Sequence, residues 1–292
     1  MGAQAKGSST LFNEGIESVK GVFSDLLFIF LIINLRKSYA SYFGVSICFS
    51  IQVDKNINKL SDQFKAVIKP SKMMELERLF MLQAEMDSLE FDQSLGLKHS
   101  FKKRSTPFKL PADDGRVFSN YFANIVVSEM GTRELQPMRY RVRPQGSKEE
   151  VPSKFNVFNA RIDSLENRQI WIPLFMRNHG IIPMTSFYEW VEGPEKKPKL
   201  ITFFPEEREM MWAPCLWDEW ISKDGRIHFK SFAIITDGPS PEIERMGHDR
   251  CPLFLSSEKM DEWLNPKGKT KKQMYEILSK REEVKYDYAW VN

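Results

Sequence analysis

The sequence contains few of the residues from which common enzyme and metal sites are built. Only three cysteines occur in 292 residues, Cys48, Cys215 and Cys251, and no two of them form a Cys-x-x-Cys pair. An odd number of separated cysteines argues against a disulfide framework and against a zinc site. A Gly-rich phosphate loop, His-Glu-x-x-His and Gly-x-Ser-x-Gly are also missing, and the four histidines are scattered. We therefore expect no metal, no cofactor and a reduced, cytoplasmic compartment.

Long hydrophobic runs and an excess of one charge are also lacking. The 42 Lys and Arg residues nearly balance 39 Asp and Glu residues, and the net charge of +3 does not identify a nucleic-acid binder. The apolar run Leu26–Ile33 is too short for a transmembrane helix, which needs about 20 residues. Its flanks also differ from those of a signal peptide, because Asp25 precedes it and the basic residues Arg36 and Lys37 follow it. We expect no membrane segment.

The chain divides by composition into a leader and a globular part. Residues 1–47 differ from the rest, and we interpret them as an N-terminal extension that need not belong to the mature protein. From Cys48 onwards the pattern is that of one domain, 48–292. Short runs rich in β-formers predominate in it, with helices towards its end. The predicted class is α+β with a strand-rich core.

Periodicity predicts the individual elements of this domain. Alternation predicts a strand at Cys48–Val53, and helical spacing predicts a helix over Lys72–Glu90. The basic stretch Lys98–Lys109 is interpreted as a solvated loop rather than a binding patch. Helices are also expected at Glu258–Leu264 and after the capping residue Thr270. Further strands are predicted at Tyr121–Val127, Met138–Val142, Gln169–Ile172, Leu200–Phe204 and Phe232–Thr236.

Two titratable side chains are candidates for proton transfer. Glu189 lies between Tyr188 and Trp190, and a carboxylate in apolar surroundings has a raised pKa. On these residues alone, an edge-strand glutamate facing water is the favoured alternative. His248 is flanked by an aspartate and an arginine, which suits a general acid or base and equally a surface turn.

Two segments place polar side chains at alternate positions. Asn159 and Arg161 would share one face of a strand, where they suit an anion, a polarised carbonyl or an ordinary polar surface. In Met138–Arg143 the same alternation puts three arginines on one face and Tyr140 with Val142 on the other. Guanidinium groups on one face repel each other unless phosphate or water lies opposite them. Both readings remain open.

Taken in order, these segments resemble the SRAP family (SOS-response-associated peptidase fold), whose members shield abasic sites in DNA. The segment Asn159–Leu165 is similar to the family's Asn-Ala-Arg-x-Glu-Thr-Leu, and Asn178–Trp190 is similar to Arg-Cys-Leu-x-Pro-x-x-Gly-Phe-Tyr-Glu-Trp. Thr236 and His248–Pro252 resemble Thr-x-x-Ala and His-x-Arg-Met-Pro. The family's Ala-Gly-Leu-Trp and late Trp-Leu are matched by Ala213–Trp217 and Trp263–Leu264. The resemblance extends from Cys48 to Leu264.

The resemblance implies a barrel-like core with peripheral helices and a monomeric, nucleoid-associated protein that binds single-stranded DNA containing abasic sites. It implies that Cys48 is the nucleophile, that Asn159 positions it, and that Glu189 and His248 transfer protons. Lyase or peptidase activity would accompany these roles. The implied DNA-contacting residues are Arg139, Tyr140, Arg141, Arg143, Arg161, Trp190, Thr236 and Arg250.

The position of Cys48 conflicts with the family chemistry, in which the cysteine is N-terminal. Its α-amine and thiol together would close a thiazolidine ring on the aldehyde of an opened abasic site, and an internal cysteine has no free amine. Here Cys48 follows Ile47, and the family's Cys-Gly-Arg start reads Cys48-Phe49-Ser50. Either the leader comes from start-site choice, or proteolysis removes it, or it is retained. The alternative functions are a thiol autopeptidase that cleaves before Cys48 and a non-catalytic single-strand binder.

Overall fold

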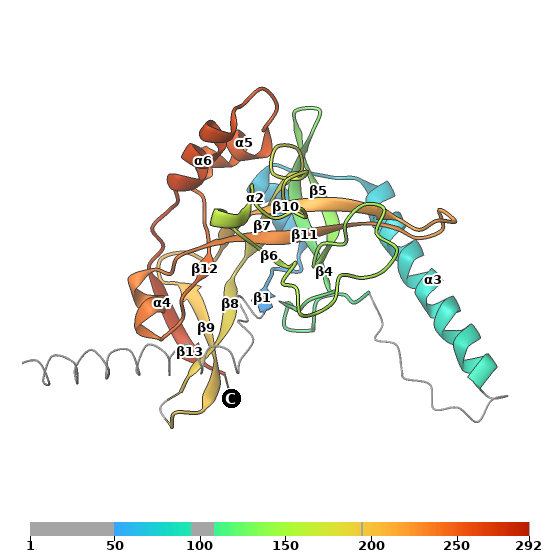
Figure 1. Ribbon diagram of the computed structural model, residues 1–292, viewed down its shortest axis with the longest axis horizontal. Helices are drawn as coiled ribbons and strands as arrows, with labels where there is room; N and C mark the ends of the chain where they lie inside the picture. Colours follow the sequence, from blue (N-terminus) through green and yellow to red (C-terminus); the bar gives the residue numbers. More distant parts are fainter. Residues whose placement is uncertain (1–49, 95–107, 194, 292) are drawn as a thin grey trace, which may run out of the picture. The chain divides into compact units, whose positions relative to one another are not determined.

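The structure is a computed structural model that describes residues 50–94, 108–193 and 195–291 (Figure 1). The predicted strand at Cys48–Val53 is observed in part as β1, Ser50–Gln52. Cys48 itself, the leader 1–47 and most of the basic stretch Lys98–Lys109 lie outside the described residues. The predicted domain boundary before Cys48 therefore stays a prediction.

The first long hairpin shows how local sequence determines strand pairing. Strands β4 (Phe122–Glu129) and β5 (Thr132–Tyr140) are joined by a two-residue turn at Met130 and Gly131. Both turn residues have positive φ angles, 51° and 81°, as a type I′ turn requires. Such a turn matches the right-handed twist of the flanking strands, so it fixes the register of the hairpin.

Five strands close into a barrel, which confirms the predicted α+β class with a barrel-like core. Antiparallel pairing links β5 through β4 to β7 (His179–Met184), then to β10 (Met211–Ile221) and β11 (His228–Asp237). The circle closes where β11 pairs in parallel with β5, with Phe232 beside Tyr140. Because the barrel is closed, these strands leave no open edge at that point.

A second sheet and several short strands attach to the barrel and form the surroundings of the candidate site. The second sheet has the order β13-β9-β8-β1-β3. Two short strands pair with the end of β11, β6 in parallel and β12 antiparallel, and β2 pairs with β5. The bounds of these strands are Val67–Ile68 (β2), Arg116–Val117 (β3), Asn159–Arg161 (β6), Ser186–Glu192 (β8), Pro198–Pro205 (β9), Cys251–Pro252 (β12) and Tyr286–Trp290 (β13).

The helices lie around the strands, and the three predicted ones are confirmed. Thr270 caps the last of them, because its Oγ1 accepts a hydrogen bond from the backbone N–H of Gln273 at 3.3 Å. Figure 1 shows the longest helix, α3, extending away from the barrel. The helices are α2 (Ile57–Phe64), α3 (Pro70–Ser94), η1 (Ile162–Ser164), α4 (Pro241–Arg245), α5 (Ser257–Leu264) and α6 (Lys271–Ser279).

One predicted strand, Gln169–Ile172, is wrong. This segment forms helical turns in which the backbone N–H groups of Trp171 and Ile172 donate to the carbonyl oxygen of Arg168. Trp171 and, just after the segment, Leu174 and Phe175 are buried and are spaced as on one face of a helix. A short apolar run does not distinguish a strand from a buried helical turn, and here the local hydrogen bonds determine the outcome. The predicted strands at residues 121–127, 200–204 and 232–236 are confirmed, and the one at 138–142 ends at Tyr140.

The packing around Gly180 of β7 predicts a sharp effect of substitution. A Cβ at this position would lie 2.7 Å from Cγ2 of Ile125 and 3.0 Å from Sγ of Cys215. Both neighbours are fully buried, and the β-branched Ile125 has little rotamer freedom. We expect Gly180→Ala to lower the free energy of unfolding by about 1–3 kcal/mol in urea denaturation. At Gly238 a Cβ meets no described atom within 4 Å, so Gly238→Ala should stay within about 0.5 kcal/mol. Equal losses in both variants would contradict this packing argument.

Candidate functional site

The first described strand, β1, pairs with the strand that carries Glu189. Ser50 of β1 lies opposite Tyr188 of β8, and Glu189 is the next residue along β8. The segment around His248 follows α4 and returns to the barrel through β12, which pairs with the end of β11. Residues far apart in the sequence therefore meet where β1, β8, β6 and β12 come together (Figure 1).

Glu189 and His248 form a buried ion pair at this junction. Oε2 of Glu189 lies 3.2 Å from Nε2 of His248, and their side chains are 0% and 9% exposed. The other ring nitrogen, Nδ1, donates to the carbonyl oxygen of Arg250 at 2.8 Å. Both ring nitrogens of His248 therefore face acceptors, which is the environment of a protonated imidazolium. The expectation that Glu189 points into water is wrong, because its side chain is fully buried.

The charge of His248 is determined by two opposing effects. Burial by itself would lower its pKa, but the hydrogen bond and negative charge of Glu189 outweigh burial and raise the pKa to about 9. His248 is therefore a cation at neutral pH. It holds a proton that it can donate, next to a carboxylate that can accept one.

Asn159 and Tyr140 form a second buried polar contact close to the barrel wall. Asn159 lies beside Ile234 in the parallel pair of β6 and β11 and is 1% exposed. Its Oδ1 accepts a hydrogen bond from the hydroxyl of Tyr140 at 3.2 Å. The Tyr140 ring is fully buried and stacks on Phe232, with ring centroids 5.0 Å apart. This burial corrects the predicted role of Tyr140: it orients Asn159 and does not present its ring to a base.

Two of the three arginines around Tyr140 pair with one carboxylate, Glu150, and the third binds the backbone next to it. The guanidinium of Arg139 donates to both oxygens of Glu150, at 2.7 and 3.0 Å, and Arg143 donates at 3.3 Å. Arg141 donates to the carbonyl oxygen of Val151. The predicted face of three arginines directed at phosphate is thus replaced by an internal cluster. Arg139 is 0% exposed, so the predicted direct contact of this side chain with DNA is wrong.

The remaining predicted DNA-contacting residues are distributed between surface and interior. Trp190 is 43% exposed. Arg161 is about as exposed and pairs with Asp163. The Oγ1 of Thr236 and the Nε of Arg250 are buried, and no described residue forms a hydrogen bond with either atom. Two donor groups are therefore available close to the Glu189–His248 pair, where β11 meets β6 and β12.

Sequence reasoning missed Arg116 on β3. Its Nε donates to Oγ of Ser50 at 2.9 Å, and its guanidinium lies 3.9 Å above the ring of Tyr188 and 4.7 Å above that of Phe118. Burial lowers the pKa of Arg116. The residue follows an Asp-Asp-Gly turn with no motif around it, so only the pairing of β1 with β3 and β8 brings it to the site.

The two described cysteines are poor nucleophiles. Burial raises the pKa of Cys251 to about 11 and that of Cys215 well above its usual value. Neither thiol supplies much thiolate at neutral pH. Within the described residues, no group of three or more His, Cys, Asp or Glu side chains is placed to hold a metal ion. The described helices include none with the length and apolar character needed to cross a bilayer.

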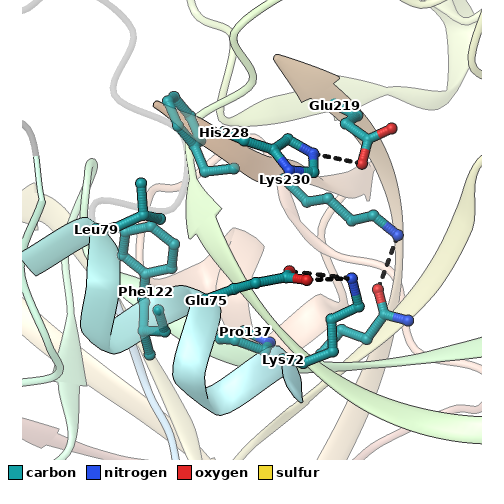
Figure 2. Close-up of a pocket in the computed structure, with 11 residues that line it drawn as sticks. Lys72, Glu75, Leu79, Phe122, Pro137, Glu219, His228 and Lys230 are labelled. Carbon is teal, nitrogen blue, oxygen red and sulfur yellow. Dashed lines mark hydrogen bonds and ion pairs between the residues drawn. The ribbon is translucent and has the colours of Figure 1, made fainter. Parts of the chain in front are cut away.

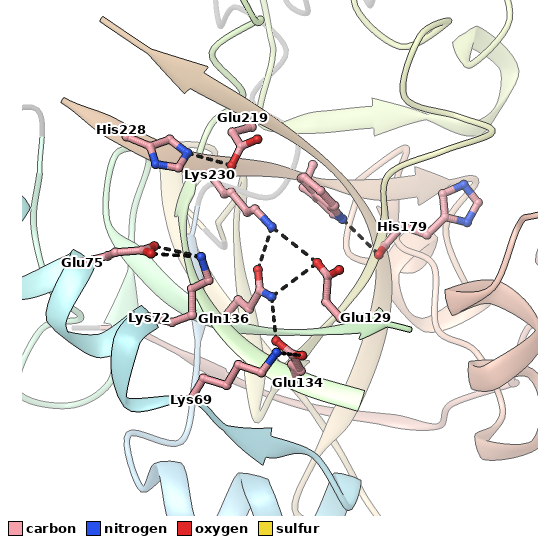
Figure 3. A network of polar contacts seen from close by, with 11 residues as sticks. Lys69, Lys72, Glu75, Glu129, Glu134, Gln136, His179, Glu219, His228 and Lys230 are labelled. Atoms are coloured by element: carbon pink, nitrogen blue, oxygen red, sulfur yellow. Dashed lines mark hydrogen bonds and ion pairs between the residues drawn. The ribbon is translucent and has the colours of Figure 1, made fainter. Parts of the chain in front are cut away.

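A separate pocket lies between the start of α3 and the barrel and contains none of the predicted site residues (Figure 2). Lys72 pairs with Glu75, which is three residues further along α3, and Nε2 of His228 lies 2.7 Å from Oε1 of Glu219. Figure 3 shows Lys230 directed between Gln136 and Glu129, with a hydrogen bond of 2.8 Å to Gln136. These charged groups already have partners. We interpret the pocket as part of the contact between α3 and the barrel, in which Leu79 packs with Phe122 and Phe229.

The pairing of Arg139 and Arg143 with Glu150 predicts that this carboxylate stabilises the fold. Glu150→Gln would leave these two guanidinium groups without a negative partner. We expect the free energy of unfolding to fall by about 1–3 kcal/mol, less than at a fully buried pair because Glu150 is partly exposed. Glu149→Gln is the matched control, because its exposed side chain takes no part in the cluster. Equal stability of the two variants in urea would contradict the role assigned to Glu150.

The raised pKa of His248 predicts a specific dependence of stability on pH. Because its folded-state pKa of about 9 exceeds its ordinary value of 6.5, its contribution is complete below pH 6.5. That contribution, on the order of 3 kcal/mol, is lost as pH rises through about 9. Urea denaturation from pH 6 to 10 should show the loss in the unsubstituted protein and not in His248→Gln. Parallel pH profiles for the two proteins would contradict the raised pKa.

Comparison with known proteins identifies the family. Residues 95–292 match the model of the SOS response associated peptidase (SRAP) family. Two Bacillus subtilis (strain 168) proteins, abasic site processing proteins YobE and YoqW, are each 27% identical over 143 residues. The matches cover 49% of this chain and 64% and 62% of those proteins, so the chain spans less than two thirds of either relative.

A solved structure with low sequence identity to this chain also supports the fold. The crystal structure of a Bacteroides thetaiotaomicron protein superposes with a TM-score of 0.58 at 17% identity, covering 84% of this chain and 92% of the other. The family model matches well over half of the 292 residues, and the barrel with its attached strands has the architecture of this neighbour. The chain belongs to the SRAP family.

Proposed function

We propose that this protein recognises abasic sites in single-stranded DNA and bonds to them covalently through the α-amine and thiol of Cys48, once that residue is N-terminal. Membership of the SRAP family and similarity to the abasic site processing proteins YobE and YoqW support a role at abasic sites. The proposal includes the removal or absence of the leader before Cys48. It also treats the protein as a monomer that works at the nucleoid.

The proposal rests on the buried Glu189–His248 pair, which lies beside β1, the strand that follows Cys48 in the sequence. Cys48 precedes Ser50 by two residues, and two residues of extended chain span at most about 7 Å. Ser50 itself lies opposite Tyr188, the neighbour of Glu189. The residue proposed as nucleophile is therefore connected by a very short stretch of chain to the strand that carries the proposed acid–base pair.

The chemistry favours a terminal cysteine over other nucleophiles. An α-amine has a pKa of about 7.7–8.0, so roughly a tenth or more of it is neutral at pH 7, whereas a lysine with a pKa of about 10.4 is almost entirely protonated. The thiol of the same residue can then attack the imine carbon and close a five-membered ring. The described cysteines, Cys215 and Cys251, have neither a free amine nor a low pKa.

The reaction balances with the proton carried by His248. The amine attacks the aldehyde carbon of the opened sugar and a C–N bond forms. One amine proton passes to the aldehyde oxygen, which becomes a hydroxyl. Protonated His248 donates to this hydroxyl, which leaves as water, and the remaining nitrogen proton returns through Glu189 to His248, leaving the neutral imine. The thiol sulfur then bonds to the imine carbon while its proton passes to nitrogen. The sum is aldehyde plus cysteine giving thiazolidine plus water.

The other buried groups have supporting roles in this proposal. Glu189 accepts and returns the proton that opens the sugar ring, and it restores the charge of His248. Asn159, oriented by Tyr140, positions the amine. Arg161 and Arg250 bind phosphate, Thr236 donates its hydroxyl to the strand, and the exposed Trp190 offers a face for a base.

The decisive experiment uses an oligonucleotide with one abasic site and the protein beginning at Cys48. We expect a heat-stable shifted band on a denaturing gel. Cys48→Ala should abolish the band, and Cys48→Ser should fail to form the stable ring because it lacks the thiol.

Two controls separate the proposal from its alternatives. An oligonucleotide without the abasic site should give no band, because it carries no aldehyde. Intact mass of the full chain tests whether the leader is cleaved before Cys48 and whether Cys48→Ala prevents that cleavage. A full-strength crosslink from Cys48→Ala, or none from the protein beginning at Cys48, would contradict the proposed function.

A further inference from the structure

A cluster of lysines lies on the turn between α5 and α6, at the upper left of Figure 1. The segment 265–273 contains four lysines and no acidic residue. We refer to these four side chains as the lysine surface: Lys267, Lys269, Lys271 and Lys272. Three of the four are exposed and Lys269 is half-buried. The mild net charge of the whole chain conceals this local concentration.

Neighbouring acids neutralise this surface only in part. Lys271 pairs with Glu166 at 2.5 Å, and within the part of the chain that the structure describes Lys267 and Lys272 form no ion pair. Two of the three acids of α5 have partners of their own: Glu262 pairs with Lys259, and Asp261 pairs with an arginine of β5. The surface therefore presents positive charge to solvent.

The stability of α6 does not explain the presence of these lysines. Lys271 and Lys272 occupy the first turn of α6, and that turn contains no acidic residue. Cations there face the partial positive charge of the helix end, which disfavours them. The helix is held instead by the Thr270–Gln273 capping box and by its buried face, which includes Met274. Residues that act against local stability are expected where a function requires them.

The lysine surface contacts the segment that follows Arg161. Arg161 pairs with Asp163, and Glu166, three residues further along, pairs with Lys271 of the lysine surface. A strand of DNA held at Arg161 would therefore have the lysine surface close by.

We propose that the lysine surface binds the phosphodiester backbone of the DNA strand beyond the abasic nucleotide. This inference rests on the proposed function for the identity of the DNA. Lysine contacts to phosphate carry no sequence information, so the surface extends the footprint of the protein without restricting sequence. An acidic protein is the less suitable partner, because lysine is depleted in protein interfaces and exposed apolar residues are missing from the described segment 265–273.

The test measures non-covalent binding, so it does not depend on the crosslink. A fluorescent single-stranded oligonucleotide without an abasic site is titrated with the full chain at several salt concentrations. Each phosphate contact contributes about −0.7 to the slope of log K against log salt for single strands. We expect Lys267→Ala/Lys272→Ala to make the slope shallower by about 1.4.

The matched control removes two basic residues from another turn. Lys223 and Arg226 are exposed in the β10–β11 turn, which Figure 1 shows on the opposite side of the barrel from α5 and α6. Lys223→Ala/Arg226→Ala carries the same change in net charge, and its slope should equal that of the unsubstituted protein. An unchanged slope in the Lys267/Lys272 variant, or equal changes in both double variants, would overturn the proposal.

The two proposals fail separately. If the lysine surface binds DNA but Cys48 does not react, the slope changes while no crosslink forms. If Cys48 reacts but the lysine surface does not bind DNA, the crosslink forms and the Lys267/Lys272 variant has the same salt slope as the unsubstituted protein. A polyglutamate peptide tests the protein-partner alternative, because tighter binding of that peptide than of the oligonucleotide at equal charge would overturn the assignment to DNA.

Discussion

The burial of Glu189 constrains the rest of the site. A carboxylate with no solvent exposure is costly unless a positive partner and hydrogen bonds compensate it. His248 is that partner, and it comes from a segment almost 60 positions further along the chain. To bring the two together, β8 must pair with β9 on one side, and β12 must return to the end of β11. The fold around the site can therefore be understood as the framework that keeps this pair dry and close.

The molecule contains two kinds of cluster of basic residues. The cluster on Glu150 is internal: its arginines hold the end of β5, and through Tyr140 they support Asn159. The lysines on the α5–α6 turn are external, and their charge is only partly neutralised. A sequence cluster of basic residues can thus be internal in one case and solvent-exposed in another. Whether a carboxylate lies close enough to pair with the cluster decides between the two.

Much of the fold could be predicted from the sequence, because its elements have strong local signals. Candidate capping residues before α5 and α6 and the periodic apolar residues of α3 predicted helices that the structure confirms. The segment Gln169–Ile172 lacked such a signal, and it forms helical turns in which Trp171 is buried and Ile172 is exposed. Local patterns were sufficient where a segment is long and amphipathic and insufficient for a short apolar run.

The candidate site was predictable in its residues but not in its geometry. Ordered motifs singled out Asn159, Glu189 and His248, yet the sequence alone favoured a solvent-facing Glu189. Arg139 and Tyr140 were assigned to DNA contacts by the family resemblance, although alternation placed them on opposite faces of the strand. In the structure both are buried, since β5 also pairs with β11 and Glu150 covers its end. Arg116 had no motif at all, and only the pairing of β1 with β3 and β8 places it beside Ser50.

In the proposed function, the Glu189–His248 pair assists Cys48 as the nucleophile. The most direct measurement is tandem mass spectrometry of the protein beginning at Cys48 after reaction with an abasic-site oligonucleotide. We predict a single adduct on the N-terminal peptide, with the mass of both reactants less one water. An adduct on a lysine, or on Cys215 or Cys251, would contradict it.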